Sequence, residues 1–343
     1  MNGRSLRPVV EATLHDCGLP GAVVAAARGD EPPTHAVVGT DAEGRPLADD
    51  TLFPVASITK LATALCVLRL VDERVVALDD ALVAYLPQAK AAQPGVTLRT
   101  LLTHTSGLPF EIGADSAPPW EHRSWDDFVT AWVATPLEVE PCTRVGYSNV
   151  GYALLGLVLE RVCGKPIDEV VRSLVLAPLN IEAYLGEEPP RAPATLVDPL
   201  GPGTATAWWN TPYWRSFPLP YVGLVTTAAG AIALARAFAP PFLAAETAAE
   251  ATTDQTGGLA GQFADRPWGP LPWGLGPPIG RLLAGSSRSF GHGGVTSCMV
   301  WVDPKTGVAV AALGTLVGLE WLNRGVPQIA AALASQPAEA TRL

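Results

Sequence analysis

Lysine is scarce in this chain of 343 residues, which contains only four, at positions 60, 90, 165 and 305. Lysine and arginine together number 23 against 33 acidic residues, they form no basic stripe, and the formal net charge is −10. Proteins that bind nucleic acid through its phosphates carry clustered positive charge. The composition therefore predicts no nucleic-acid partner.

Long apolar runs are missing as well. The most apolar later stretch, residues 228–245, is interrupted by Arg236 and two prolines, whereas a membrane-spanning helix needs about 20 apolar residues in a row. The first eight residues show neither the apolar core nor the cleavage site of a secretory leader. Five cysteines without metal-ligand spacing predict free thiols in a reducing compartment. We therefore expect a cytoplasmic protein with no membrane partner.

Motifs for metals and nucleotides are also absent. His15, His35 and His122 share no metal-ligand spacing with each other or with acidic residues, and no Gly-rich phosphate-binding loop occurs. We therefore expect no metal and no cofactor. Charged residues make up 16% of the chain and hydrophobic residues 48%, a balance typical of a large compact core.

What the chain does contain is a hydroxyl and an amine one helical turn apart, in Ser57-Ile58-Thr59-Lys60. Residues three apart on a helix face the same way, and a partly desolvated lysine can take the proton of a serine hydroxyl. The apolar run 61–70 that follows predicts a buried helix. Ser57 would lie at its start, where free N–H groups favour developing negative charge. Alone, this spacing is equally typical of a helix surface.

A second cluster is Tyr147-Ser148-Asn149, with glycines at 146 and 151 on either side. The glycines predict a tight loop that leads into a helix. Near the lysine, the Tyr147 phenol could relay a proton, and Asn149 could hold both the lysine and a substrate carbonyl. The alternative is a helix N-cap at Ser148 or Asn149, with Tyr147 packed in the core.

A third cluster surrounds His292 with glycines, in Phe290-Gly291-His292-Gly293-Gly294-Val295. Glycines beside one polar residue at the start of a strand let a ligand approach the backbone closely. A strand edge that passes the nucleophile could supply a backbone N–H to an oxyanion hole, and His292 a polar contact to the substrate. The alternative is a Gly-rich turn with a surface histidine.

In this order and spacing, the three clusters resemble the signature of the serine β-lactamase and penicillin-binding-protein superfamily. The resemblance covers roughly residues 10–335 and extends to connecting segments such as Leu101–Pro109 and Gly223–Thr227. Antibiotic-directed members usually carry Lys-Thr-Gly as their third motif, whereas this chain has His292-Gly293-Gly294 there. That pattern resembles the class C-like branch, which includes the family VIII carboxylesterases and the D-aminopeptidase and amidase group.

A Lys-Thr-Gly does occur later, at Lys305-Thr306-Gly307. It follows Asp303-Pro304 and lies between two expected strands, so its sequence is typical of a hairpin turn. We predict that this lysine faces solvent and takes no part in catalysis.

The resemblance implies a role for each residue of the three clusters. Ser57 would be acylated, and Lys60 and Tyr147 would share the general-base and proton-shuttle work, with the base itself left open. Backbone N–H groups of Ser57 and Val295 would form the oxyanion hole. A neutral imidazole at His292 would make little demand for a carboxylate on the substrate. The predicted substrate contacts are Asn149, His292, Gly293, Gly294 and Val295.

The predicted elements place strands at both ends of the chain and helices between them. Strands are expected at 21–28, 34–39, 298–302 and 308–313, and helices at 5–17, 58–72, 125–134, 151–162, 228–238 and, beginning at Pro327, near 327–333. This pattern predicts an α+β fold, an antiparallel sheet built from both chain ends and flanked by helices, with an inserted, mostly helical lobe. The resemblance makes it β-lactamase/transpeptidase-like. We expect a sheet lobe of residues 1–56 plus 223–343, a helical lobe of residues 57–222, and the site between them.

The segment 186–221 is Pro-rich and Trp-rich with little helical period. Long irregular segments in compact domains are usually functional or mobile. We predict that Trp208 and Trp214 contact the substrate as an aromatic wall, helped by Trp120, Trp268 and Trp273. The alternative is that these rings only anchor the segment. His104 is predicted to have a structural role in its own loop.

Taken together, the motifs predict a serine hydrolase that acts through an acyl-enzyme on Ser57. Its partner would be a small-molecule substrate, with small esters favoured and D-amino-acid amides or peptides next. Acyl transfer to an alcohol or amine by the same acyl-enzyme is an alternative. A β-lactam-acylating sensor or weak β-lactamase is a weaker one. The oligomeric state is left open.

Overall fold

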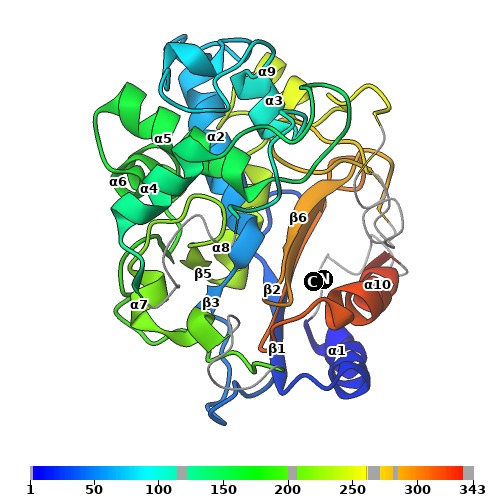
Figure 1. Ribbon diagram of the computed structural model, residues 1–343. Coiled ribbons are helices and arrows are strands. Elements are labelled where there is room, and N and C mark those ends of the chain that lie inside the picture. The colour runs from blue at the N-terminus through cyan, green and yellow to red at the C-terminus, as the bar shows by residue number, and fades with distance from the viewer. Residues whose placement is uncertain are drawn as a thin grey trace.

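The computed structural model of this protein describes residues 3–113, 122–199, 207–259, 261, 271–280 and 285–334. Within them, a five-stranded sheet has the order β2-β1-β8-β7-β6, and every neighbouring pair is antiparallel. Because β1 pairs with β8, the sheet joins the two ends of the chain (Figure 1). The predicted α+β class is confirmed. The strands are β1 (Gly21–Arg28), β2 (Thr34–Gly39), β6 (Phe290–Gly294), β7 (Cys298–Asp303) and β8 (Val308–Gly314).

Helices cover both faces of this sheet. α1 (Gly3–Cys17) and α10 (Glu320–Ala334) lie side by side on one face, and α8 (Ala228–Arg236) packs on the other (Figure 1). The side chains of β1 point alternately to the two faces. Val23 and Ala25 belong to the main core, whereas Ala22 and Val24 belong to a second core that includes α1 and α10. Successive strand side chains point to opposite faces. A strand of small apolar residues therefore suits a sheet that is buried on both sides.

The helices of the middle region lie close to their predicted bounds where a cap defines them. Ser124 Oγ accepts from Asp127 N (3.2 Å) at the start of α4, and Ser148 Oγ accepts from Gly151 N (2.9 Å) at the start of α5. The other helices and helical turns are α2 (Thr59–Asp72), η2 (Leu82–Ala84), α3 (Leu98–Leu102), α4 (Trp125–Ala134), α5 (Asn149–Cys163), α6 (Ile167–Val171), the π-helical turn Arg172–Leu176, η6 (Ala207–Asn210), α7 (Pro212–Arg215) and α9 (Ala245–Ala251).

Two predicted elements differ in the structure. The closing helix begins at Glu320, and Pro327 lies inside it rather than at its first position. Trp321 and Val326 are fully buried in the second core, and this burial outweighs the hydrogen bond that proline cannot donate. The Gly-rich cluster forms a strand of its own, β6, and does not begin the next strand. Ser297, at φ +53, makes the turn between β6 and β7.

A second, smaller sheet was not predicted. Its strands are β3 (Phe53–Pro54), β5 (Val225–Thr226) and β4 (Ala183–Tyr184), in the order β3-β5-β4. Two residues are too few for an alternating pattern to stand out in a sequence. This small sheet ends just before Ser57, so it fixes the approach of the chain to the predicted nucleophile.

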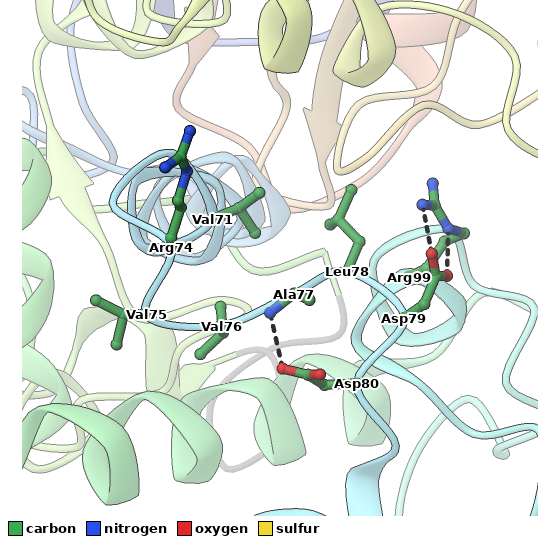
Figure 2. A pocket seen from close by; sticks show the side chains of 9 residues that line it. All are labelled: Val71, Arg74, Val75, Val76, Ala77, Leu78, Asp79, Asp80 and Arg99. Carbon is green, nitrogen blue, oxygen red and sulfur yellow. Dashed lines mark hydrogen bonds and ion pairs between the residues drawn. The ribbon is translucent and has the colours of Figure 1, made fainter.

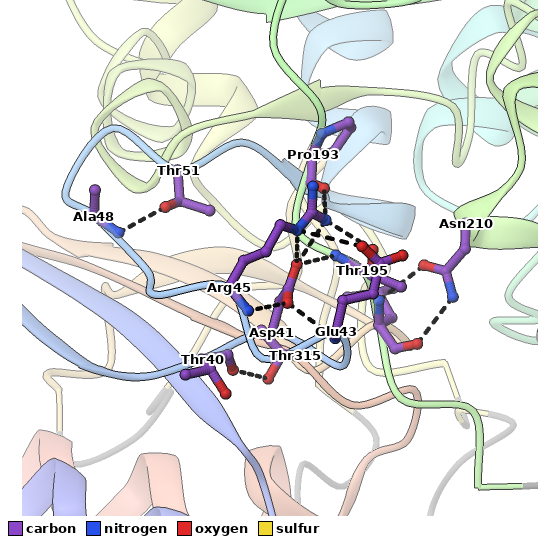
Figure 3. Close-up of polar contacts among 11 residues, drawn as sticks. Thr40, Asp41, Glu43, Arg45, Ala48, Thr51, Pro193, Thr195, Asn210 and Thr315 are labelled. Carbon is purple, nitrogen blue, oxygen red and sulfur yellow. Dashed lines mark hydrogen bonds and ion pairs between the residues drawn. The ribbon is translucent and has the colours of Figure 1, made fainter.

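The irregular segment 186–221 is tied to the sheet region at residue 195 by a buried carboxylate. Asp41, 3% exposed, accepts hydrogen bonds from the backbone N–H groups of Glu43 and Thr195 and from the Arg45 guanidinium (Figure 3). These hydrogen bonds overcome the opposing effect of burial and hold the pKa of Asp41 below its usual value. The described part of the segment is irregular as predicted, apart from η6 and α7, yet it is firmly attached here.

Three further observations bear on the sequence predictions. All five cysteines are free thiols, as predicted, and Cys142 is exposed while Cys66 and Cys298 are buried. Within the described ranges, none of the helices combines the length and apolarity that crossing a bilayer requires. The division into lobes of residues 1–56 plus 223–343 and 57–222 stays a prediction.

Candidate active site

Ser57 lies in a sharp turn between β3 and α2. The turn is a single 3₁₀ segment, η1 (Ala56–Ile58), and Ala56 has φ +45, in a left-handed region that non-glycine residues rarely adopt. Thr59 Oγ1 donates to Ala56 O (2.6 Å) and accepts from Leu224 N (3.0 Å), which fixes the turn from within the protein. Strained backbone of this kind persists only where its surroundings determine it. Here it presents the half-buried Ser57 at the start of α2.

Lys60 is fully buried, and its amine faces three oxygens. Nζ lies 2.7 Å from Asn149 Oδ1, 3.0 Å from the Tyr221 carbonyl oxygen and 3.3 Å from Ser57 Oγ. The two carbonyl oxygens can only accept, so they fix two N–H groups of the lysine. Once the amine is a free base, its lone pair therefore points at the Ser57 hydroxyl. Burial lowers the pKa of Lys60 well below its ordinary value, with Glu111 opposing this, so the free base is accessible.

Tyr147 lies beside the same pair. Its ring centroid is 4.7 Å from Lys60 Nζ, and a hydrogen bond with Ser57 lowers the pKa of the phenol, but burial has the larger effect and raises that pKa above its ordinary value. The environments thus shift the two pKa values in opposite directions, that of Lys60 downward and that of Tyr147 upward. Such a divergence assigns the base and the acid of a pair. It favours Lys60 as the base and a protonated Tyr147.

His292 lies on β6, the edge strand of the sheet, as predicted, and is 5% exposed. Its Nδ1 is 2.8 Å from Gly293 O, so Nδ1 carries the proton and donates. Nε2 is then a buried acceptor that has no partner among the described residues. Burial, and to a lesser degree Lys60, lowers the pKa of His292 to about 3. The imidazole is therefore neutral at neutral pH, in agreement with the sequence prediction.

The end of β6 lies directly against the nucleophile turn. A Cβ atom at Gly294 would come within 2.5 Å of Val55 O and 3.3 Å of Ser57 N, so only glycine fits there. The next residue, Val295, is 39% exposed. The three sequence clusters therefore come together in the fold, with Ser57 and Lys60, Tyr147 and Asn149, and His292 to Val295 in one place.

His104 holds the loop that carries Tyr147, a structural role like the one predicted. It is buried at φ +58, and its Nδ1 accepts from Ser148 N at 3.1 Å. Its ring centroid lies 4.4 Å from that of Tyr147 and 4.5 Å from that of Trp273. Burial lowers the pKa of His104 well below its ordinary value, so this imidazole is also neutral.

The two neutral imidazoles predict that the free energy of unfolding falls as the pH is lowered. Their pKa values are below 6.5 in the folded protein, about 3 for His292, so protons bind preferentially to the unfolded chain. The loss is absent above pH 6.5, grows below it, and is complete for His292 near pH 3. Each imidazole contributes at most about 1.4 kcal/mol per pH unit. Urea unfolding at about pH 7 and about pH 5 measures the slope.

The matched variants are His292→Gln and His15→Gln. His15 has a side chain that is 90% exposed and serves as the surface control, whereas His292→Gln should flatten the slope. An identical slope in all three proteins would show that His292 binds its proton equally in the folded and unfolded states.

Sequence reasoning missed Glu111 and Tyr221. Glu111 accepts from Asn149 Nδ2 at 3.0 Å, and Tyr221 supplies the carbonyl oxygen that faces Lys60. Trp273, which the sequence did predict as a helper of the aromatic wall, lies 5.6 Å from Tyr147 and 5.8 Å from His292, measured between ring centroids. Glu111 follows the family-like segment 101–109 by two residues, but nothing local indicates that it faces Asn149. The contact exists only after folding.

The predicted aromatic wall is tested only in part. Trp214 is 8% exposed and packs edge-on against Trp209, with 5.3 Å between ring centroids. Trp208 is half-buried against the main core. A contact of either ring with the substrate stays a prediction. Trp120 and Trp268 lie outside the described residues, whereas Trp273 does line the cluster.

Two other features are not part of this cluster. Lys305 is exposed in the turn between β7 and β8, where Gly307 N donates to Asp303 O (2.8 Å), so the predicted solvent-facing hairpin is confirmed. A cavity of about 480 Å³ lies at the far end of α2, about 20 Å along the helix from Ser57. Figure 2 shows that its Arg99 is already paired with Asp79. Over the described ranges, no group of His, Cys, Asp or Glu side chains is arranged to hold a metal ion.

Comparison with known proteins identifies the family and the fold of this chain. A family model described as Beta-lactamase matches residues 6–334. Esterase EstB of Burkholderia gladioli is 34% identical over an alignment of 206 positions that covers 54% of this chain and 52% of EstB, so the chain spans about half of EstB's length.

Two solved structures share the fold. EstCE1, described as a hydrolase with promiscuous acyltransferase activity, has a TM-score of 0.77 at 23% identity and covers 96% of this chain and 99% of its own. D-amino acid amidase from Ochrobactrum anthropi SV3 has a TM-score of 0.78 at 20% identity, with 97% and 99% covered. These likenesses confirm the β-lactamase/transpeptidase-like fold.

Proposed function

The chain belongs to the beta-lactamase family, and on that premise we propose that it is a serine hydrolase whose reaction passes through an acyl-enzyme on Ser57. One observation carries the proposal. The buried Lys60 amine has two N–H groups fixed by Asn149 and Tyr221 and faces the Ser57 hydroxyl at 3.3 Å. This is the arrangement of a nucleophile beside a base that is itself oriented by further groups.

Acylation would begin with proton transfer from Ser57 Oγ to Lys60 Nζ as Oγ attacks the substrate carbonyl. The resulting oxyanion would be bound by the backbone N–H groups of Ser57 and Val295, whose neighbour Gly294 lies against the nucleophile turn. Tyr147 would give its proton to the leaving oxygen or nitrogen and regain one from Lys60. Water would then attack the acyl-enzyme, release the acid and restore the Ser57 hydroxyl. The protonated state of Tyr147 supports its role as the proton donor.

Small carboxylic esters are the substrate class that the site supports best. The neutral His292 offers no permanent charge for a substrate carboxylate. The rim carries exposed apolar side chains, since Phe110 is 50% exposed and stacks on Tyr147 at 6.0 Å, and Val295 is 39% exposed. The relation to esterase EstB points the same way over the matched half. We also propose a cytoplasmic location, because an exposed Cys142 thiol suits a reducing compartment.

Trp208 and Trp214 are proposed to shape the acyl pocket. Replacing either with alanine should change the ratio of kcat/KM for p-nitrophenyl butyrate over acetate by at least about 5-fold, because each methylene in an apolar pocket contributes about 1–3 kcal/mol. Steady-state kinetics and thermal melting of the same samples give the result. An unchanged ratio with a lowered Tm would mean that the rings only anchor their segment.

The reaction class is tested with the wild-type protein. A fluorophosphonate should add one adduct, seen by intact-protein mass, and p-nitrophenyl acetate and butyrate should be turned over. Added alcohol separates hydrolysis from transfer, since a transferase would form the new ester in preference to the acid. An adduct without turnover of either kind would indicate a sensor. A protein that neither labels nor turns over would not be a serine hydrolase.

A further inference from the structure

Lys60, Asn149 and Glu111 form a line of hydrogen bonds that leads away from the nucleophile. Lys60 Nζ donates to Asn149 Oδ1 at 2.7 Å, and Asn149 Nδ2 donates to Glu111 Oε2 at 3.0 Å. Glu111 is itself held by Ile112 N, which donates to Oε1 at 3.1 Å. Asn149 is 7% exposed, so water has little access to its amide. The Asn149 amide could face the lysine with either its oxygen or its NH₂ group, and here the oxygen faces it.

We propose that Glu111 is a positioning residue for acylation: it fixes the Asn149 amide with Oδ1 toward Lys60 and so keeps the lone pair of the lysine on Ser57. The inference rests on the proposed function of Ser57 and Lys60. An ionised carboxylate can only accept, so Nδ2 must face Glu111. A flipped amide would set Oδ1 against the carboxylate and the NH₂ group against the amine. Both contacts would be lost, and the lysine would be free to turn away from Ser57.

Glu111 also acts on the lysine through its charge. Among the described residues, the titratable groups around Lys60 are Glu111 and the uncharged side chains of His104, His292, Tyr147, Tyr152 and Tyr221. Of these, Glu111 favours the protonated lysine. Around Glu111 itself, burial raises the pKa of the carboxyl, and hydrogen bonds from Asn149 and Ile112, with the charges of Lys60 and Arg123, lower it. Glu111 thus has two effects on the lysine that variants can separate. Its hydrogen bond orients the Asn149 amide, and its negative charge favours the protonated amine.

Two variants separate them. Glu111→Gln keeps an acceptor for Asn149 Nδ2 but removes the charge, so the rate of fluorophosphonate labelling should fall only about 3-fold on its high-pH plateau, and the acid limb of its pH profile should move to lower pH. Glu111→Leu removes the acceptor, so labelling should slow about 100-fold at every pH, as expected when a reacting group is misplaced. The maximal labelling rate at saturating fluorophosphonate reports the reactivity of the nucleophile, because it does not depend on the affinity for the probe.

Glu160→Gln is the matched control. Glu160 lies on the same helix as Asn149 and also accepts from a backbone N–H, that of Ile167 at 2.9 Å, so its replacement should leave both rate and pH profile unchanged. Circular dichroism and Tm establish that each variant is folded. If Glu111→Leu misfolds, Glu111→Ala, which removes the same acceptor with a smaller side chain, takes its place in the test.

Two results would overturn the proposal. They are a Glu111→Leu plateau within about 3-fold of the wild type and an equal loss in both Glu111 variants. Each of them leaves the wild-type protein labelled and active. Failure of the proposed function is a different outcome, because the wild type would then not be labelled at all.

Discussion

Replacement of Ser57 by alanine is expected to abolish covalent labelling and to lower kcat/KM for p-nitrophenyl esters by about 10⁴- to 10⁶-fold. Ser57 Oγ is the hydroxyl that faces the Lys60 amine, and it is hydrogen-bonded to Tyr147. Without it no acyl-enzyme can form. The side chain is half-buried and small, so alanine should leave the turn and the fold intact. Intact-protein mass after fluorophosphonate treatment, beside steady-state turnover, measures both effects.

The control for this experiment is Ser173→Ala. Ser173 is an exposed serine whose hydroxyl donates to Val170 O within its own helical turn, so that variant should label and turn over like the wild type. Labelling that persists in Ser57→Ala would place the nucleophile elsewhere and remove the main support for the mechanism.

Replacement of Lys60 by methionine is expected to lower both kcat/KM and the labelling rate by about 10³- to 10⁴-fold, the scale of a lost general base. Methionine has a similar length but no donor, so Asn149 Oδ1 and the Tyr221 carbonyl lose their partner in a buried place. Stability should therefore fall by about 1–3 kcal/mol. Lys60→Arg keeps donors but cannot become a free base near neutral pH, so it should be equally inactive.

The pH dependence distinguishes a base from a mere structural support. Wild-type activity should rise with pH as Lys60 loses its proton, from a pKa well below the ordinary value of lysine, and this limb should be missing in the residual activity of Lys60→Met. Lys165→Met, at an exposed position after α5, should match the wild type throughout. A Lys60→Met protein that labels at the wild-type rate would make Tyr147 the better candidate for the base.

The elements that could be predicted from sequence are those whose signal is local. β1 and β2 were placed at their observed ends, and α4 at both of its ends, because the strands run between turn residues and Ser124 caps the helix. The family motifs also predicted which residues meet, although Ser57 and His292 lie far apart in the chain. The order of the family motifs predicted this contact, whereas the secondary-structure propensity of each segment does not.

The misses share a different cause, since each depends on the tertiary fold. β3, β4 and β5 have two residues each and exist because the chain passes beside Ser57. α10 extends back to Glu320 because Trp321 finds a buried site against α1, where its Nε1 donates to Thr13 Oγ1 at 3.3 Å. Glu111 and the Tyr221 carbonyl meet Asn149 and Lys60 only when four distant segments have docked. A single sequence gives no signal for such contacts.

The pairing of β1 with β8 has a consequence for how this protein reaches its native state. Ala22 lies opposite Gly314, so the central pair of strands joins residues almost a full chain length apart. Closing so large a loop costs entropy before any contact compensates for it, and domains dominated by distant contacts fold slowly. β6, which carries His292, pairs with β7, and β7 in turn pairs with β8. The candidate active site is therefore complete only after β7 and β8 have paired with β1, and activity recovered during refolding would report that pairing.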